Sequence, residues 1–124
     1  ATGKLFDIDW QHPDAPTPRV FEGHSSLVRL NHSGQEAVDL VVRVMSHWLE
    51  RGIDGWRLDA AYSVPPEFWS KVVKRVRPRH PNAWLLGEVL HGDYCAFVAE
   101  SGIDSVTQRL IHKTPEPVWK SILN

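Results

Sequence analysis

Two acidic side chains end apolar, strand-like segments of this sequence. Asp59 closes the segment GWRLD, and Glu88, 29 positions later, closes the segment AWLLGE. This spacing is about one strand–helix–strand repeat, so successive parallel strands would bring both carboxylates to one edge of a sheet. That carboxyl edge is where α/β folds place their active sites. The spacing therefore predicts a site built on two carboxylates.

The expected distance between these acids indicates the chemistry. Neighbouring parallel strands lie about 4.8 Å apart, which is near the roughly 5–5.5 Å between the two carboxyl groups of retaining glycoside hydrolysis. Strand alternation places Arg57 and Asp59 on one face, where the arginine favours the ionised carboxylate that a nucleophile requires. Trp56 and Leu58 would point the other way and pack on helices.

One further expectation concerns the surroundings of Glu88. Gly87 has no side chain, and we expect it to leave room for a substrate beside the acid. An alternative interpretation stays open at this point: Arg57 and Asp59 could form a structural ion pair, with Glu88 a solvated loop acid. The common spacing of the two strand-end acids favours the site.

Helical periodicity defines the clearest element. Apolar residues recur at helical spacing over about 34–51, Ser33 and Glu36 form an S-x-x-E capping box, and Gly52 follows as a stop. The remaining elements alternate: strand 54–59, helix 66–77, strand 83–89, helix 93–101, strand 103–107 and a last helix opening at 114–116. Alternating strands and helices predict an α/β fold with a parallel sheet, and the apolar run 83–89 predicts a strand buried on both faces.

Composition excludes several classes. The chain has 124 residues, 42% hydrophobic content and a formal net charge of −1, which fits one modest domain and gives no indication of nucleic acid or membrane as partner. We interpret the basic run 74–77 as a solvated helix face. Three early histidines match no zinc pattern. A single cysteine and no signal peptide at the start favour a cytoplasmic location, although localisation stays undetermined.

The motifs themselves resemble a known family. The segments GWRLDAAYSV and GEVLHG, together with LVRLN, HWLERGIDG and IDSV in the same order, resemble the α-amylase family of glycoside hydrolases. The resemblance implies a (β/α)8 TIM barrel, which needs about 250 residues. It therefore implies a partial barrel: residues 31–124 as strands 4 to 6 with their helices, and residues 1–30 as the irregular tail of an inserted loop domain.

The resemblance also implies roles for individual residues. Asp59 matches the nucleophile that forms a covalent glycosyl-enzyme, Glu88 matches the general acid/base, and Arg57 matches the arginine that orients the nucleophile. The implied reaction is retaining hydrolysis of α-glucosidic bonds. The implied partner is an α-linked glucose oligosaccharide or polysaccharide.

The sequence departs from the family pattern near the predicted substrate contacts. Tyr62 and Ser63 stand where many amylases carry a Lys-His pair. We predict Tyr62, Trp56 and His91 as substrate-binding residues, and we expect no cofactor and no metal, since the histidine associated with a structural calcium is missing. The chain also lacks the Asn-His-Asp motif that carries the family's third catalytic acid.

Three alternatives remain on the sequence alone. A transglycosylase or isomerase of the same family would share these residues. A non-catalytic, amylase-like binding or transporter-associated protein is a second alternative. A flavodoxin-like binding domain lacks support, because no Gly-rich phosphate loop follows the first strand. We expect the isolated 124 residues to have little glycosidase activity, and we expect the open barrel edges to favour self-association.

Overall fold

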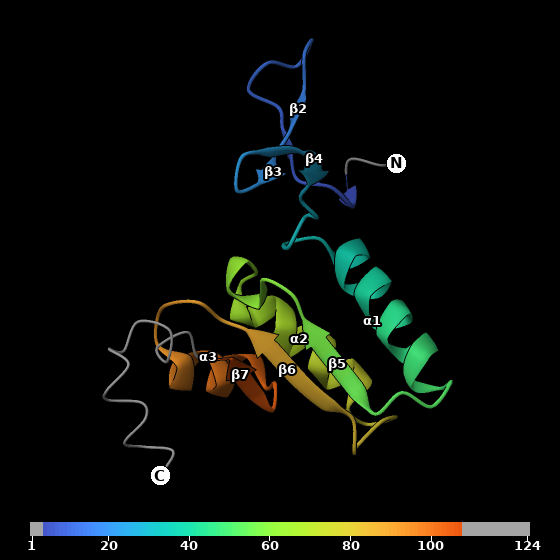
Figure 1. Ribbon diagram of the computed structural model, residues 1–124. Coiled ribbons are helices and arrows are strands. Elements are labelled where there is room, and N and C mark those ends of the chain that lie inside the picture. The colour runs from blue at the N-terminus through green and yellow to red at the C-terminus, as the bar shows by residue number, and fades with distance from the viewer. Residues whose placement is uncertain (1–3, 108–124) are drawn as a thin grey trace, which may run out of the picture.

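A three-stranded parallel sheet is the centre of the molecule. The computed structural model describes residues 4–107, in which β5 (Gly55–Leu58), β6 (Trp84–Glu88) and β7 (Ser105–Thr107) lie side by side in that order (Figure 1). Both pairings are parallel. The predicted α/β arrangement is therefore confirmed, while the predicted helix from 114 lies outside the described residues.

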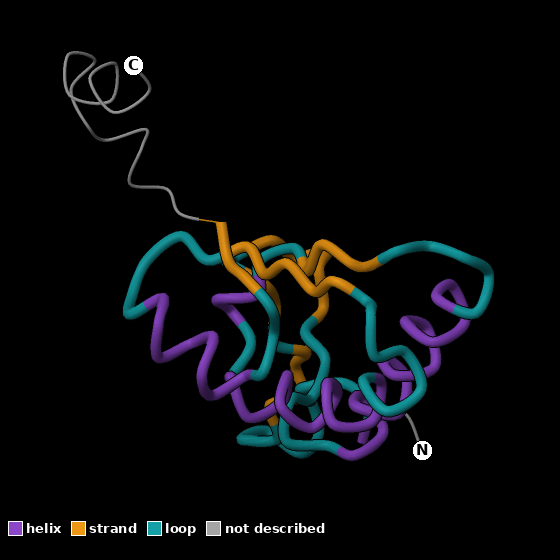
Figure 2. The backbone as a smooth tube through the Cα atoms, turned by 90° about the horizontal axis from the view of Figure 1, so that it is seen from below, coloured by secondary structure: helices purple, strands orange, loops and turns teal. Residues whose placement is uncertain are grey.

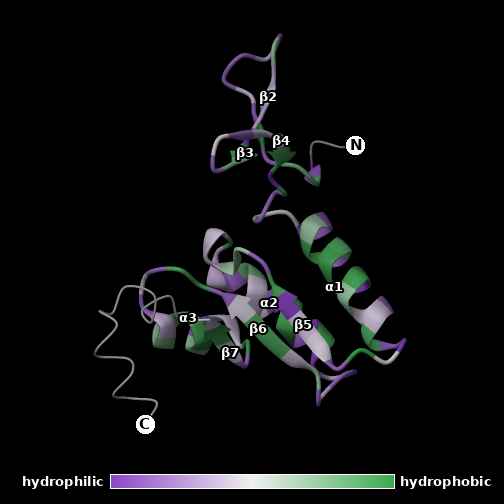
Figure 3. Ribbon diagram, viewed as in Figure 1, coloured by the Kyte–Doolittle hydropathy of each residue, from purple (hydrophilic) through white to green (hydrophobic). Residues whose placement is uncertain are grey.

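Three helices cover one face of this sheet. They are α1 (Gln35–Leu49), α2 (Pro66–Val76) and α3 (Tyr94–Ser101), and Figure 2 shows them on the same side of the strands. All three agree with the predicted segments to within a few residues. Their apolar residues pack on β5 and β6 to form one core, and Figure 3 shows the apolar colour along the helices, most plainly on α1. None of the helices within residues 4–107 is long and apolar enough to cross a membrane.

The two faces of β6 have different environments. Leu85, Gly87 and Val89 are buried on the side of the helices, whereas Trp84 on the other face is 59% exposed. The prediction of a strand buried on both faces is wrong for the described residues, because helices cover one face only. The expectation for Gly87 is also wrong: a Cβ there would lie 2.6 Å from Ile103 Cδ1, inside the core. Gly87 permits core packing and does not make room for a substrate.

The first thirty residues contain more order than expected. Strand β1 (Ile8–Asp9) pairs with β2 (Thr17–Pro18), and β3 (Val20–Phe21) pairs with β4 (His24–Val28). Both pairs are antiparallel, so this segment is two short hairpins where an irregular tail was predicted. The prediction failed because β1, β2 and β3 have only two residues each and β4, HSSLV, has no alternation of apolar and polar residues.

The start of α1 differs from the predicted capping box. Gly34 is the N-cap and makes no side-chain cap hydrogen bond. The backbone N–H of Ser33 donates instead to Asn31 Oδ1, 3.1 Å away. Ser33 therefore belongs to the turn before the helix. The predicted stop is present: Gly52 has a φ of +97° and follows the end of the helix.

The register between β5 and β6 brings the two strand-end acids together. Arg57 lies opposite Leu86 and Leu58 opposite Gly87, so the next residues, Asp59 and Glu88, are neighbours. Gly55 permits this pairing, because a Cβ at that position would lie 2.1 Å from the carbonyl oxygen of Trp84. A larger residue would push the strands apart.

An ion pair joins the helical layer to the opposite end of the sheet. Arg77 Nη2 lies 3.0 Å from both carboxylate oxygens of Asp104, and its Nη1 donates to the carbonyl of Ala83 at 2.7 Å. Asp104 also accepts the backbone N–H of Leu85 at 2.7 Å. The interpretation of 74–77 as a solvated face is therefore wrong at Arg77, which is partly buried.

Asp104→Ala is expected to lower the free energy of unfolding by about 2–3 kcal/mol, since it leaves a partly buried guanidinium and a strand N–H without their acceptor. The matched control is Asp39→Ala, which removes the exposed partner of Arg75. That change should lower the free energy of unfolding much less, because solvent screens an exposed ion pair. Urea unfolding measures both, and equal losses would contradict the account of Asp104.

Candidate functional site

Three side chains meet at the carboxyl edge of the sheet. Arg57 Nη1 donates to Asp59 Oδ1 at 2.5 Å, and Arg57 Nη2 lies 2.9 Å from Glu88 Oε1. One guanidinium therefore bridges the two acids predicted to form the site. The sequence indicated the contact with Asp59, but the contact with Glu88 depends on the pairing of two separate strands.

Glu88 has a second anchor in the backbone. The N–H of Ala60 donates to Glu88 Oε2 at 2.9 Å. Ala60 has φ 46° and ψ 37°, a left-handed conformation that non-glycine residues rarely adopt. The chain therefore turns sharply directly after Asp59, and the turned N–H points at the neighbouring acid. Such strain is concentrated at functional sites in many proteins.

The charges of the site act on each other. The hydrogen bond that Arg57 donates to Asp59, followed by the negative charge of Glu88, raises the pKa of Arg57 above its ordinary value. The guanidinium therefore stays protonated at any physiological pH. The Asp59 side chain is 79% exposed and that of Glu88 is 25% exposed, so a ligand can reach both from the open side of the sheet.

Tyr62 and His91 lie together beside the carboxylate pair. Their ring centroids are 5.1 Å apart at an interplanar angle of 63°. Tyr62 lies in the short helix η2 (Ala61–Ser63) after β5, and His91 in the loop after β6. The Tyr62 hydroxyl also donates to Glu22 Oε1 at 2.6 Å. The sequence did not predict Glu22; its one signal is the dipeptide Glu-Gly between two short strand-forming runs.

The structure separates Trp56 from these residues. Its indole N–H donates to the carbonyl of Met45 in α1 at 3.3 Å, and its ring packs against the core. Strand alternation places it on the face opposite to Arg57. The substrate contact at Trp56 stays a prediction, whereas the expected packing on helices is confirmed.

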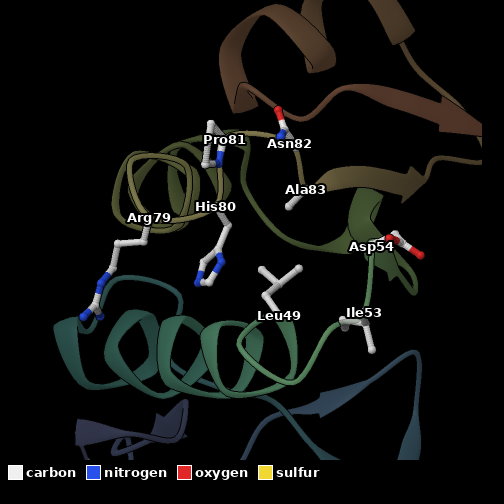
Figure 4. Close-up of a pocket in the computed structure, with 8 residues that line it drawn as sticks. All are labelled: Leu49, Ile53, Asp54, Arg79, His80, Pro81, Asn82 and Ala83. Atoms are coloured by element: carbon white, nitrogen blue, oxygen red, sulfur yellow. The ribbon is translucent and has the colours of Figure 1, made fainter.

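A pocket lies at the other end of the strands. It has a volume of about 320 Å³ and is lined by the loops that lead into β5 and β6, and Figure 4 shows Leu49 and His80 pointing into it. Asp54 and Asn82 belong to its lining, but their side chains turn outward in Figure 4. The pocket therefore does not gather the convergent polar groups that chemistry requires, and it lies at the amino edge of the sheet, away from Asp59.

The carboxylate edge has the parts for one class of reaction. An exposed carboxylate can attack an electrophilic carbon, a neighbouring carboxyl group can transfer a proton, and a fixed cation can hold both in place. Within residues 4–107, no cluster of three or more histidine, cysteine or acidic residues is arranged to hold a metal ion.

Comparisons with known proteins agree with this arrangement. A family model described as the catalytic domain of alpha amylase matches residues 19–112. A cyclomaltodextrinase from a Bacillus species is 35% identical over 77 residues, which is 61% of this chain and 14% of the relative. Neopullulanase 2 from Thermoactinomyces vulgaris is 32% identical over 89 residues, which is 72% of this chain and 15% of the relative.

Solved structures show the same similarity. A debranching enzyme from Nostoc punctiforme superposes with a TM-score of 0.69 at 28% identity, over 84% of this chain and 23% of that enzyme. The chain spans about 15% of the length of the two curated relatives named above. The similarity therefore covers most of this chain and a small part of each relative.

The strained conformation of Ala60 gives a test of the site's construction. Ala60→Gly is expected to leave the free energy of unfolding unchanged or to raise it by up to about 1 kcal/mol, because glycine adopts a positive φ without strain. Ala60→Val should lower it by about 1–2 kcal/mol, because a β-branched residue disfavours this conformation. Chemical denaturation compares the two variants, and a valine variant as stable as the glycine variant would contradict the assigned backbone geometry.

Proposed function

We propose, from the premise that this chain belongs to the alpha-amylase catalytic-domain family, that it carries the catalytic pair of a retaining hydrolase acting on α-glucosidic bonds. The substrate is an α-linked glucose oligosaccharide or polysaccharide. The observation that carries the proposal is the Arg57 guanidinium held between Asp59 and Glu88 at the ends of adjacent parallel strands.

The first step forms a covalent intermediate. A carboxylate oxygen of Asp59 bonds to the anomeric carbon of the sugar while the bond from that carbon to the leaving oxygen breaks. Glu88 gives its proton to the leaving oxygen, so the departing sugar leaves as a neutral alcohol. Arg57 holds the attacking carboxylate in place before the reaction.

The second step releases the sugar. Glu88, now ionised, takes a proton from a water molecule as the water oxygen bonds to the anomeric carbon. The bond to Asp59 breaks and its carboxylate is restored. Two displacements at the same carbon return the original configuration, so the product keeps the α-anomeric form. The anchor from Ala60 N–H keeps Glu88 on the side of the sugar where both proton transfers occur.

The extent of the chain suggests its place in a larger catalytic domain. We propose that residues 31–124 are strands 4 to 6 of a (β/α)8 barrel with their helices, and that residues 1–30 end an inserted loop domain. The open face of the sheet, on which Trp84 is exposed, would then line the barrel interior. On this proposal the isolated 124 residues have little or no activity, since a barrel needs about 250 residues.

Two substitutions in the intact protein test the catalytic roles. Asp59→Asn is expected to lower kcat by about 10⁴-fold or more, because the nucleophile is lost. Glu88→Gln should lower turnover of natural α-glucans by about 10²–10⁴-fold. It should spare the glycosylation step of an aryl α-glucoside whose leaving group needs no proton. Steady-state and burst kinetics measure both effects.

Asp54→Asn is the matched control, because this acid lies at the amino end of the same strand. It should keep normal turnover. Near-normal activity of Asp59→Asn would refute the nucleophile assignment. Measurable turnover of an aryl α-glucoside by the isolated 124 residues would refute the proposed dependence on the rest of a barrel.

A further inference from the structure

The turn of the β3–β4 hairpin reaches the candidate site from a distant part of the sequence. Glu22 lies in this turn, 40 positions before Tyr62, and its Oε1 accepts the Tyr62 hydroxyl at 2.6 Å. The distance is short for an O–H donor, as expected when the acceptor is ionised. A segment that supplies none of the predicted catalytic residues thus contributes a carboxylate to the same edge of the sheet.

The backbone at this turn indicates that the Glu22 side chain has a role. Glu22 and Gly23 are the two loop residues of the hairpin, with φ angles of +46° and +79°. Such turns favour asparagine, aspartate or glycine at the first of these positions, and glutamate there is strained by about 1–2 kcal/mol. Among residues 4–107, Glu22 and Ala60 are the two non-glycine residues with positive φ. The backbone N–H of Ala60 donates to Glu88, and the carboxylate of Glu22 accepts from the hydroxyl of the neighbouring Tyr62.

Tyr62 is the point at which three segments meet. The hairpin turn supplies Glu22, the helix after β5 supplies Tyr62, and the loop after β6 supplies His91, whose ring meets that of Tyr62 edge to face. The hydrogen bond to Glu22 is the largest cause of a raised Tyr62 pKa, to which the charges of Glu88 and Asp59 also contribute. Tyr62 therefore stays a neutral phenol within the field of the two catalytic acids.

We propose that Glu22 is a positioning residue that fixes Tyr62 as a sugar-binding side chain at the rim of the carboxylate site. This inference rests on the proposed function. A tyrosine held in one orientation can present its ring to the apolar face of a glucose unit without losing rotamer freedom on binding. No hydrogen bond within the described residues uses Glu22 Oε2, so this oxygen can accept a sugar hydroxyl.

The competing explanation is that the contact only holds the hairpin in place. In that case removal of the Glu22 carboxylate would lower stability and leave substrate binding unchanged. The positioning role predicts instead that removal of the Glu22 carboxylate weakens substrate binding and leaves stability unchanged. It also predicts that the effect depends on Tyr62, because Glu22 acts mainly through that residue.

The experiment measures kcat, KM and the melting temperature of the intact protein with maltotriose as substrate. Glu22→Asn suits the turn better than glutamate but is one methylene shorter, so it should lose the contact without destabilising the hairpin. We expect KM to rise about 3- to 10-fold, the worth of one hydrogen bond. We expect kcat to stay within twofold and the melting temperature not to fall.

Four further variants complete the design. Glu22→Gln keeps a carbonyl oxygen at the original distance, so its KM should rise less than that of Glu22→Asn. Tyr62→Phe should raise KM, and the double variant Glu22→Asn/Tyr62→Phe should raise it no further than the larger single change. Ser25→Ala, an exposed position of the same hairpin, is the control and should behave as the wild type.

An unchanged KM in Glu22→Asn would overturn the inference, as would a fully additive double variant. Either result leaves the proposed function intact, because that proposal is tested by the loss of turnover in Asp59→Asn. Conversely, normal turnover in Asp59→Asn would remove the proposed function whatever the Glu22 variants do. The two failures are therefore distinguishable in the same series of proteins.

Discussion

The guanidinium of Arg57 shared between Asp59 and Glu88 is the interaction on which the candidate site depends. Two acids held side by side repel each other whenever both are ionised, and a protonated arginine between them offsets that repulsion. The contact is available only in one register of β5 against β6, because a slip of one residue would turn Arg57 toward the helices. Gly55 permits that register through its close approach to the neighbouring strand. The close approach of the two strands at Gly55 thus permits the register that places Arg57 between the two acids at the other end of the strand.

The two edges of the sheet have different properties. At the amino edge, Arg77 and Asp104 form a partly buried ion pair that also satisfies backbone groups of β6, which favours a rigid scaffold. At the carboxyl edge, the positive φ angles of Ala60 and Glu22 hold polar groups in positions that unstrained backbone would not reach. The stabilising ion pair therefore lies at one edge and the candidate functional groups lie at the other, as in α/β barrels generally.

The local elements and the adjacency of the two strand-end acids were predictable from the sequence, because they follow from periodicity and from the spacing of acids at strand ends. Helix α1, strand β5 and the parallel order are examples. Features that depend on which distant segments meet were not predictable. Examples are the packing of Gly87 close to Ile103 and the hydrogen bond between Tyr62 and Glu22. The prediction of a capping box at Ser33 failed for a local reason, because the backbone N–H of Ser33 donates to the side chain of Asn31.

The central claim is that Asp59 forms a covalent bond to the sugar, and trapping of that intermediate tests it most directly. The intact protein is incubated with 5-fluoro-α-glucosyl fluoride, in which the fluorine beside the ring oxygen slows release of the sugar, and is then digested and analysed by mass spectrometry. The account predicts one fluoroglucosyl group on the peptide that contains Asp59, and no label in the Asp59→Asn variant. Label on another residue, or turnover with inversion of the anomeric configuration, would contradict it.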